Sequence, residues 1–227
     1  MKYVYIDELS DRSEISDDTK FLIYRNYFDH RDIIVPDNIY QLKVTTNGLI
    51  NLPESLKLLY YSSTIPIERF PDGLVGLNIS NISDNTVFPN SLKSLILRDI
   101  TVSKLVLPNN LDKLKLSNCN INCDIILPES LKMLSLFRIT KIPNVSHLKN
   151  LKTLVLFDTS INYIPNLPIK YIYLTITGSD NSIPSFFGYN MGIRSLAVKF
   201  YGVAYNYLKI INCIMKLQRK FKNKHFI

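Results

Sequence analysis

Histidine and cysteine, the side chains that most often carry catalysis or bind metals, are few and scattered in this chain. The three histidines, His30, His147 and His225, lie far apart, and none stands in a nucleophile or metal-binding motif. Cys119 and Cys123 are four residues apart, but no second pair completes a zinc site. The seven glycines are spread singly and form no phosphate-binding loop. The sequence therefore predicts no catalytic or metal site, no cofactor and no small-molecule substrate, and a protein that is not an enzyme.

A periodic leucine pattern organises the chain instead. Its clearest copy, Pro108–Ile121, reads P-x-x-L-x-x-L-x-L-x-x-C-x-I. The same pattern recurs on both sides of this copy, with other aliphatic residues or tyrosine at some of the leucine positions. The nine copies begin at Pro36, Pro53, Pro71, Pro89, Pro108, Pro128, Leu148, Pro168 and Asn190. Successive copies are thus 17 to 22 residues apart, and a period near 20 residues is typical of a leucine-rich repeat solenoid.

Each copy is expected to form one coil. Leu114 and Leu116 are separated by one residue, so in a strand both point inward while Lys115 points outward. Stacked coils pair these strands into a parallel sheet, and a proline before each strand suits a turn that enters it. The predicted fold class is an α/β-type repeat: a right-handed leucine-rich repeat solenoid with short coils, a parallel inner sheet and a helical C-terminal cap.

The position three residues after the last leucine of each copy is expected to lie at a turn. Polar residues there can hydrogen-bond buried backbone groups, whereas isoleucines must pack against the core. The polar residues at this position are Asn47, Thr64, Cys119, Thr159 and Ser179, and the isoleucines are Ile82, Ile100 and Ile139. Because Cys119 stands at this position, we predict a structural role for its thiol.

Both ends of the chain differ from the repeats. Of the net charge of +8, residues 1–32 contribute −3 and residues 199–227 contribute +7. The apolar spacing in Asp17–Phe28 predicts an amphipathic helix after a short strand at Tyr3–Ile6, and Tyr205–Phe226 predicts a second amphipathic helix with a basic tail. We therefore divide the chain into an N-terminal cap (1–35), a solenoid of about nine coils (36–200) and a C-terminal basic helix (201–227).

Several features indicate an intracellular, cytoplasmic protein. The chain has no run of about 18 apolar residues that would span a membrane. Its N-terminus is acidic and interrupted by charge, unlike a secretory signal peptide. The three cysteines do not make a disulfide framework, which favours a reducing compartment.

The phrase Leu-Pro-x-Ser-Leu-Lys-x-Leu-x-Leu, seen at Leu52–Leu59, Phe88–Leu97 and Leu127–Leu136, closely resembles the FNIP/IP22-type leucine-rich repeats of social amoebae and large DNA viruses. The short period is also similar to that of bacterial effectors delivered into host cells. The resemblance covers about residues 36–200 and implies a viral or amoebal protein that binds a host protein in the cytoplasm. Some viral members resemble adaptors with an N-terminal F-box; here Ile15–Phe28 stands in that place but lacks the leading Leu-Pro.

The concave face of such a solenoid consists of the residues that flank the inward leucines. Two groups are prominent on it. The first, the basic centre, comprises Arg98, Lys113 and Lys115. The second, the apolar strip, comprises Met133, Phe137, Val155, Phe157 and Tyr173. Exposed apolar patches mark interaction sites, and aromatic residues, Met and Arg are enriched at interface cores. We predict that these groups bind a protein partner, unless the C-terminal helix covers the strip or the residues simply suit β strands.

Two further basic features suggest an alternative function. A lysine ladder follows the first leucine of four copies, at Lys57, Lys93, Lys132 and Lys152, where it would protect the sheet edge or bind an acidic partner. The basic tail carries Lys216, Arg219, Lys220, Lys222 and Lys224 as possible anion-binding residues. Together they allow electrostatic binding of nucleic acid or an anionic membrane.

Overall fold

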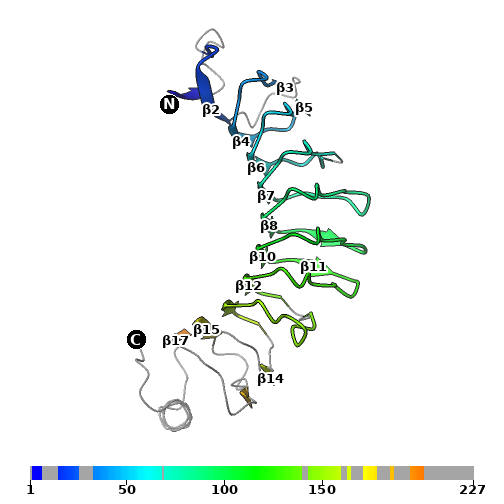
Figure 1. The fold of residues 1–227 in the computed structure, drawn as a ribbon, viewed down its shortest axis with the longest axis vertical. Helices are drawn as coiled ribbons and strands as arrows, with labels where there is room; N and C mark the ends of the chain where they lie inside the picture. The colour runs from blue at the N-terminus through cyan, green and yellow to red at the C-terminus, as the bar shows by residue number, and fades with distance from the viewer. Residues whose placement is uncertain are drawn as a thin grey trace.

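One long parallel sheet dominates the part of the chain that the structure describes (Figure 1). The computed structural model describes residues 2–6, 15–25, 33–67, 69–139, 143–159, 163–164, 171–177, 185–186 and 195–201. The sheet has 11 strands in the order β1-β2-β4-β6-β7-β8-β10-β12-β13-β15-β17. Their bounds are β1 Lys2–Ile6, β2 Thr19–Arg25, β4 Gln41–Thr45, β6 Leu58–Ser62, β7 Gly76–Ile79, β8 Ser94–Arg98, β10 Lys113–Ser117, β12 Met133–Phe137, β13 Thr153–Phe157, β15 Tyr171–Thr177 and β17 Ser195–Tyr201.

The described strands curve into an arc, with the long sheet on its concave side (Figure 1). Short strands lie on the opposite, convex side, where β3 pairs with β5, β9 with β11 and β14 with β16. Their bounds are β3 Ile33–Ile34, β5 Ile50–Asn51, β9 Thr101–Val102, β11 Asn120–Ile121, β14 Tyr163–Ile164 and β16 Ser185–Phe186. Parallel neighbours require each coil to return on the far side of the core. The described parts of these returns contain no helix.

The nine repeat copies each supply one strand of the sheet, from β4 to β17. The paired leucines point inward as predicted: Leu95, Leu97 and Leu116 are fully buried, and Leu114 is 1% exposed. Burying one such side chain stabilises the fold by roughly 1.5–3 kcal/mol. The register aligns leucine with leucine across neighbouring strands, so a slip of one residue would turn lysines into the core.

The predicted N-terminal helix at 17–28 is wrong where the structure describes it, because Thr19–Arg25 forms strand β2. This strand pairs with β1 on one side and β4 on the other, so the sheet extends into the N-terminal region. Thr19, Leu22 and Tyr24 are buried at the spacing of the repeat leucines counted from Ser16. Pairing with β4 therefore overrides the local helical spacing. The short strand expected at Tyr3–Ile6 is present as β1.

In the coils whose entry segment the structure describes, the chain enters the strand through a tight turn. The amide of the first leucine-position residue donates to the carbonyl of the proline three residues earlier, as in Leu56 to Pro53 at 3.1 Å and Leu92 to Pro89 at 3.1 Å. Thr19 makes the same bond to Ser16 at 2.9 Å, which places the N-terminal copy in the same repeat pattern. Proline suits the turn because its missing donor is not needed outside the strand.

The segment that leaves the strand turns through a left-handed residue in four adjacent coils. These residues are Asp99, Asn118, Arg138 and Asp158, with φ between 51° and 54°. Asn and Asp adopt this conformation at little cost, whereas Arg does so less readily. Their side chains join neighbouring coils: the Asn118 amide donates to the Asp99 carboxylate at 2.9 Å, and Arg138 Nε lies 3.5 Å from Asp158 Oδ2.

The serine of the Leu-Pro-x-Ser-Leu-Lys phrase forms a hydrogen bond between neighbouring coils, which the sequence did not predict. Ser91 Oγ donates to the carbonyl of Leu74 in the preceding coil at 2.6 Å, and Ser130 Oγ donates to Leu111 at 2.7 Å. Asn150, which stands at the same position, donates to the carbonyl of Glu129 in the preceding coil at 3.0 Å. A short polar side chain at this position therefore ties these coils to the ones before them.

The helical C-terminal cap predicted for Tyr205–Phe226 lies outside the described residues. The described residues contain no helix, so the α/β-type class is corrected to a parallel β-solenoid for this part of the chain. Likewise, no helix among them is long and apolar enough to cross a membrane.

Candidate functional site

The register places the side chains of the concave face in rows that run across the strands. One row contains Lys115 on β10, Ser135 on β12 and Val155 on β13. The next row, toward the ends of the strands, contains Phe137 and Phe157. These rows bring residues about 20 positions apart in sequence to within one strand spacing, about 4.8 Å.

The four residues of the apolar strip whose side chains are described are all half-buried. They are Met133, Phe137, Val155 and Phe157. In contrast, Leu134, Leu136 and Leu154, which alternate with them, are at most 1% exposed. The Phe137 and Phe157 rings stack, with centroids 5.4 Å apart and an interplanar angle of 19°. Tyr173 continues the row of Val155 on β15, but its side chain lies outside the described part.

The basic centre adjoins the strip as predicted from the repeat. Lys115 Nζ lies over the Phe137 ring, 4.2 Å from the centroid, which is cation–π geometry. Lys113 and Arg98 are exposed on β10 and β8. Arg98 on β8 pairs with Ser117 on β10, and Ser117 pairs with Phe137 on β12. Arg98 therefore lies two strands away from the stacked rings.

Ser135 lies in the middle of the strip yet is only 4% exposed. Its larger neighbours across the strands, Lys115 and Val155, account for this burial because the serine side chain is short. Within the strip, the large neighbouring side chains therefore shield the hydroxyl group of Ser135 from solvent.

A second cluster on the concave face was missed because strand β2 was expected to be a helix. This N-terminal cluster consists of Tyr5, Phe21, Ile23, Arg25, Lys43 and Tyr60. Tyr5 and Tyr60 are 47% and 40% exposed, and the Arg25 guanidinium lies 5.8 Å from the centroid of the Tyr5 ring. Phe21, Ile23, Lys43 and Tyr60 help to line a hollow of about 210 Å³. The +3, +6 and +8 spacing from Ser16 would have found this strand.

The lysine ladder lies at the entry to the strands, where it joins coils together. Lys93 Nζ donates to the carbonyl of Asn110 in the next coil at 3.2 Å. Lys132 Nζ lies 3.0 Å from the Asp112 carboxylate of the preceding coil. The ammonium group of Lys57 reaches the equivalent turn of the next coil. It lies so close to Gly73 that a β-carbon at that position would collide with it. These contacts engage Lys57, Lys93 and Lys132 within the protein. The tail residues from Lys216 to Lys224 lie outside the described part.

Cys119 has the structural role that its repeat position predicts. Its side chain is 5% exposed, and Sγ donates to the carbonyls of Leu97 at 3.5 Å and Ser117 at 3.3 Å. Burial raises the pKa of the Cys119 thiol, so the reactive thiolate is disfavoured. Ile100 and Ile139 pack at the same position in their coils, at 3% exposure each.

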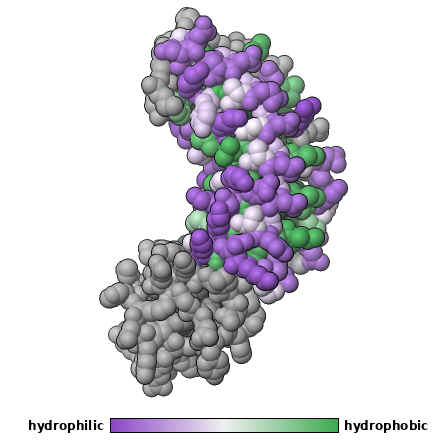
Figure 2. Space-filling model, in the orientation of Figure 1, coloured by the Kyte–Doolittle hydropathy of each residue, from purple (hydrophilic) through white to green (hydrophobic). Residues whose placement is uncertain are grey.

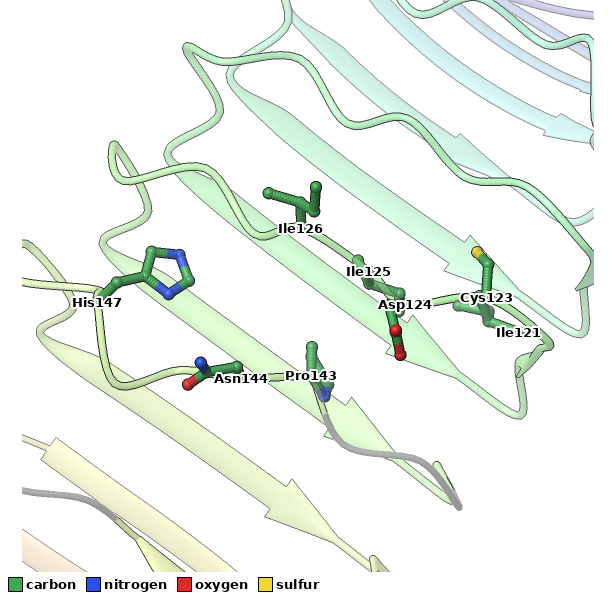
Figure 3. Close-up of a pocket in the computed structure, with 8 residues that line it drawn as sticks. All are labelled: Ile121, Cys123, Asp124, Ile125, Ile126, Pro143, Asn144 and His147. Carbon is green, nitrogen blue, oxygen red and sulfur yellow. The ribbon is translucent and has the colours of Figure 1, made fainter.

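The convex side holds a hollow of about 370 Å³ between neighbouring coils (Figure 3). Cys123 and His147 lie at opposite ends of it, so they are not placed as a nucleophile and base. His147 Nε2 is 2.8 Å from the carbonyl oxygen of Leu127, which engages that nitrogen. Among the described residues, no group of three His, Cys, Asp or Glu side chains could hold a metal ion.

Comparisons with known proteins support the fold and leave the function open. No protein-family model and no curated protein matches the chain. Among solved structures, the chain is similar to one titled "The crystal structure of CroV588 a novel circular LRR protein structure", with a TM-score of 0.51 and 19% sequence identity. The match covers 82% of this chain and 34% of that chain, so this chain spans about a third of that protein's length. At this identity the likeness shows a leucine-rich repeat type of solenoid and nothing about partners.

Proposed function

We propose that the protein is a non-enzymatic interaction module that binds a protein partner on the concave face of its solenoid. The single observation that carries the proposal is the apolar strip: Met133, Phe137, Val155 and Phe157 remain partly exposed on one face of the sheet. Leucine-rich repeat solenoids commonly use this face for binding.

The composition of the surface supports a protein partner. Aromatic side chains, Met and Arg are enriched at the cores of protein interfaces, and large apolar patches on a wet face are unfavourable unless a partner covers them. Phe137 and Phe157 are held against each other, so little side-chain freedom is lost when a partner docks on them.

The proposal extends to a role in the cytoplasm of a host cell, as a viral or amoebal protein. Its support is the resemblance of the Leu-Pro-x-Ser-Leu-Lys phrase to FNIP/IP22-type repeats. The serine of this phrase ties coils together, as at Ser91 and Ser130, so the phrase serves the fold and does not identify the partner.

A double substitution tests the proposal. Phe137→Ser with Phe157→Ser removes both stacked rings from the concave face. Because aromatic residues at an interface centre often contribute more than 1 kcal/mol each, we expect affinity for a captured partner to fall about tenfold or more. The measurement is affinity purification from the natural host followed by mass spectrometry, and then direct binding to the identified partner.

The matched control is Val106→Ser with Ile126→Ser, which removes two apolar side chains from another exposed surface, where they are 64% and 83% exposed. Figure 2 shows apolar residues reaching the convex edge of the arc between hydrophilic ones. The control variant should bind the partner with unchanged affinity. Far-ultraviolet circular dichroism and thermal unfolding verify that both variants fold. Unchanged partner binding by a folded Phe137/Phe157 variant would refute the proposed site.

A further inference from the structure

We infer that the partner presents an acidic segment to the concave face. This inference rests on the proposed function and names the chemistry of the partner. Its first support is the charge of the sheet: none of the strands in the described part contains Asp or Glu. Six described strand positions on the concave face carry a cation, namely Arg25, Lys43, Arg98, Lys113, Lys115 and Lys199.

Three acidic side chains near the ends of the described strands are engaged by neighbouring coils. Asp99 accepts a hydrogen bond from Asn118, and Asp158 pairs with Arg138. At the strand entries, Asp112 pairs with Lys132. The concave face therefore has a positive potential that attracts acidic groups, which guides encounter and excludes basic partners.

The stacked rings favour the same chemistry. Lys115 lies over the Phe137 ring from β10, and Phe157 stacks on it from β13, on the opposite side of β12. With both faces of the Phe137 ring covered, only its edge is offered to a partner. The edge of an aromatic ring carries partial positive charge. A carboxylate beside this edge also meets the Lys115 ammonium group.

The covered ring also argues against base stacking on Phe137. Single-stranded nucleic acids bind by stacking bases on open aromatic faces, and Phe137 has no open face. Half-buried aliphatic side chains such as Ile23, Ile96 and Val155 line the same rows and suit apolar side chains of a polypeptide.

The N-terminal cluster repeats this combination of cations and apolar side chains. From β4, in the middle of this cluster, to β12, at the stacked rings, the sheet order counts five strand steps. At about 4.8 Å a step, the two sites are roughly 24 Å apart, which about seven residues of extended chain would span. One acidic segment that crosses the strands can therefore contact both sites.

Selection from a displayed library of random peptides, long enough to span both sites, tests the inference on the full-length chain. We expect the enriched peptides to combine Asp and Glu with apolar residues. Their affinity should fall at least tenfold as salt rises from about 0.05 M to about 0.5 M. The variant Lys113→Glu with Lys115→Glu should lose these peptides and bind their counterparts in which each acid is replaced by Lys.

The control is Lys104→Glu with Lys149→Glu, which changes the net charge equally at two exposed positions outside the strands. This variant should still bind the acidic peptides, with at most a small loss of affinity. The inference is overturned if no peptide is enriched, if the enriched peptides show no excess of acids, if both variants lose them equally, or if a single-stranded oligonucleotide binds more tightly than any peptide.

The two proposals fail in different ways. If the natural partner is lost by the Phe137→Ser, Phe157→Ser variant but retained by the Lys113→Glu, Lys115→Glu variant at all salt concentrations, the proposed function stands and the acidic segment is wrong. If the folded phenylalanine variant keeps the partner, the proposed function itself fails.

Discussion

Cys119 illustrates how one residue position of the repeat accepts different chemistry. Ile100 and Ile139 fill the position by packing, whereas the Cys119 thiol also reaches two backbone carbonyls of its surroundings. A buried acceptor left without a donor costs about 1–3 kcal/mol. The thiol is therefore compatible with the core because it is both apolar enough to pack and able to donate a hydrogen bond.

The different surroundings of the two described cysteines predict different reactivity. Burial raises the pKa of the Cys119 thiol and blocks access to it, whereas Cys123 is half-buried beside a hollow. In a variant whose third cysteine is replaced, Cys213→Ser, we expect iodoacetamide near neutral pH to modify Cys123 at least tenfold faster than Cys119. Peptide mapping by mass spectrometry measures both rates.

Because a raised thiol pKa shifts thiolate formation to higher pH, labelling of Cys119 should stay slow as pH rises through the ordinary range of a cysteine. Unfolding in guanidinium chloride removes the difference and serves as the control. Equal labelling rates in the native protein would contradict the buried position of Cys119.

At the scale of the element, strand β2 shows that the same residues can satisfy two periodicities. Apolar residues in 17–28 have helical spacing, yet the structure uses the alternation of Leu22 and Tyr24. The strand interpretation is favoured by pairing with β1 and β4, which places Leu22 beside Leu42 and Tyr24 beside Val44 in one core. An isolated segment cannot reveal this pairing, because the partner strand lies about 20 residues away.

Adjacent alanine substitutions distinguish the two structures. Leu22→Ala removes a side chain that is 2% exposed and should cost about 2–4 kcal/mol of unfolding free energy. Ile23→Ala changes a half-buried side chain on the concave face and should cost less than about 1 kcal/mol. Chemical denaturation of both variants measures the difference. Similar losses for the two variants, or a larger one for Ile23→Ala, would disagree with strand β2.

At the scale of the whole molecule, each coil is stabilised mainly by its contacts with the neighbouring coils. Each coil contacts mainly the next through sheet pairing, serine-to-carbonyl bonds and the lysine ladder. A solenoid of this kind behaves as a one-dimensional chain of coupled units, so a defect in the middle separates two blocks. Strand β10 lies in the interior of the sheet order, and β1 lies at one end of the described sheet.

Leu114→Ala in β10 should therefore cost about 2–5 kcal/mol and raise amide hydrogen exchange across the neighbouring coils on both sides. Val4→Ala in β1, the matched change at one end of the described sheet, should raise exchange only in β1 and β2. Hydrogen exchange with mass spectrometry measures both patterns. Exchange confined to β10 in the Leu114→Ala variant would show that the coils are not coupled in this way.

The candidate site was partly predictable because it follows from the repeat. Once leucines recur in phase, their strands, the parallel sheet and the outward neighbours Arg98, Lys113, Lys115, Phe137 and Phe157 are determined by alternation alone. The structure then adds contacts between coils that alternation does not specify, such as the Lys115 ammonium over the Phe137 ring and the stacking of Phe137 on Phe157.

The leucine period by itself thus determined the solenoid, its register and the composition of its concave face, because a core shared by consecutive coils demands the same inward residues in each. Only the tertiary structure decided that Thr19–Arg25 is a strand and that Tyr5 and Arg25 lie on the concave face. It also decided that lysines and serines join neighbouring coils. These features depend on contacts between residues about 20 positions apart, and local sequence preference carries no information about them.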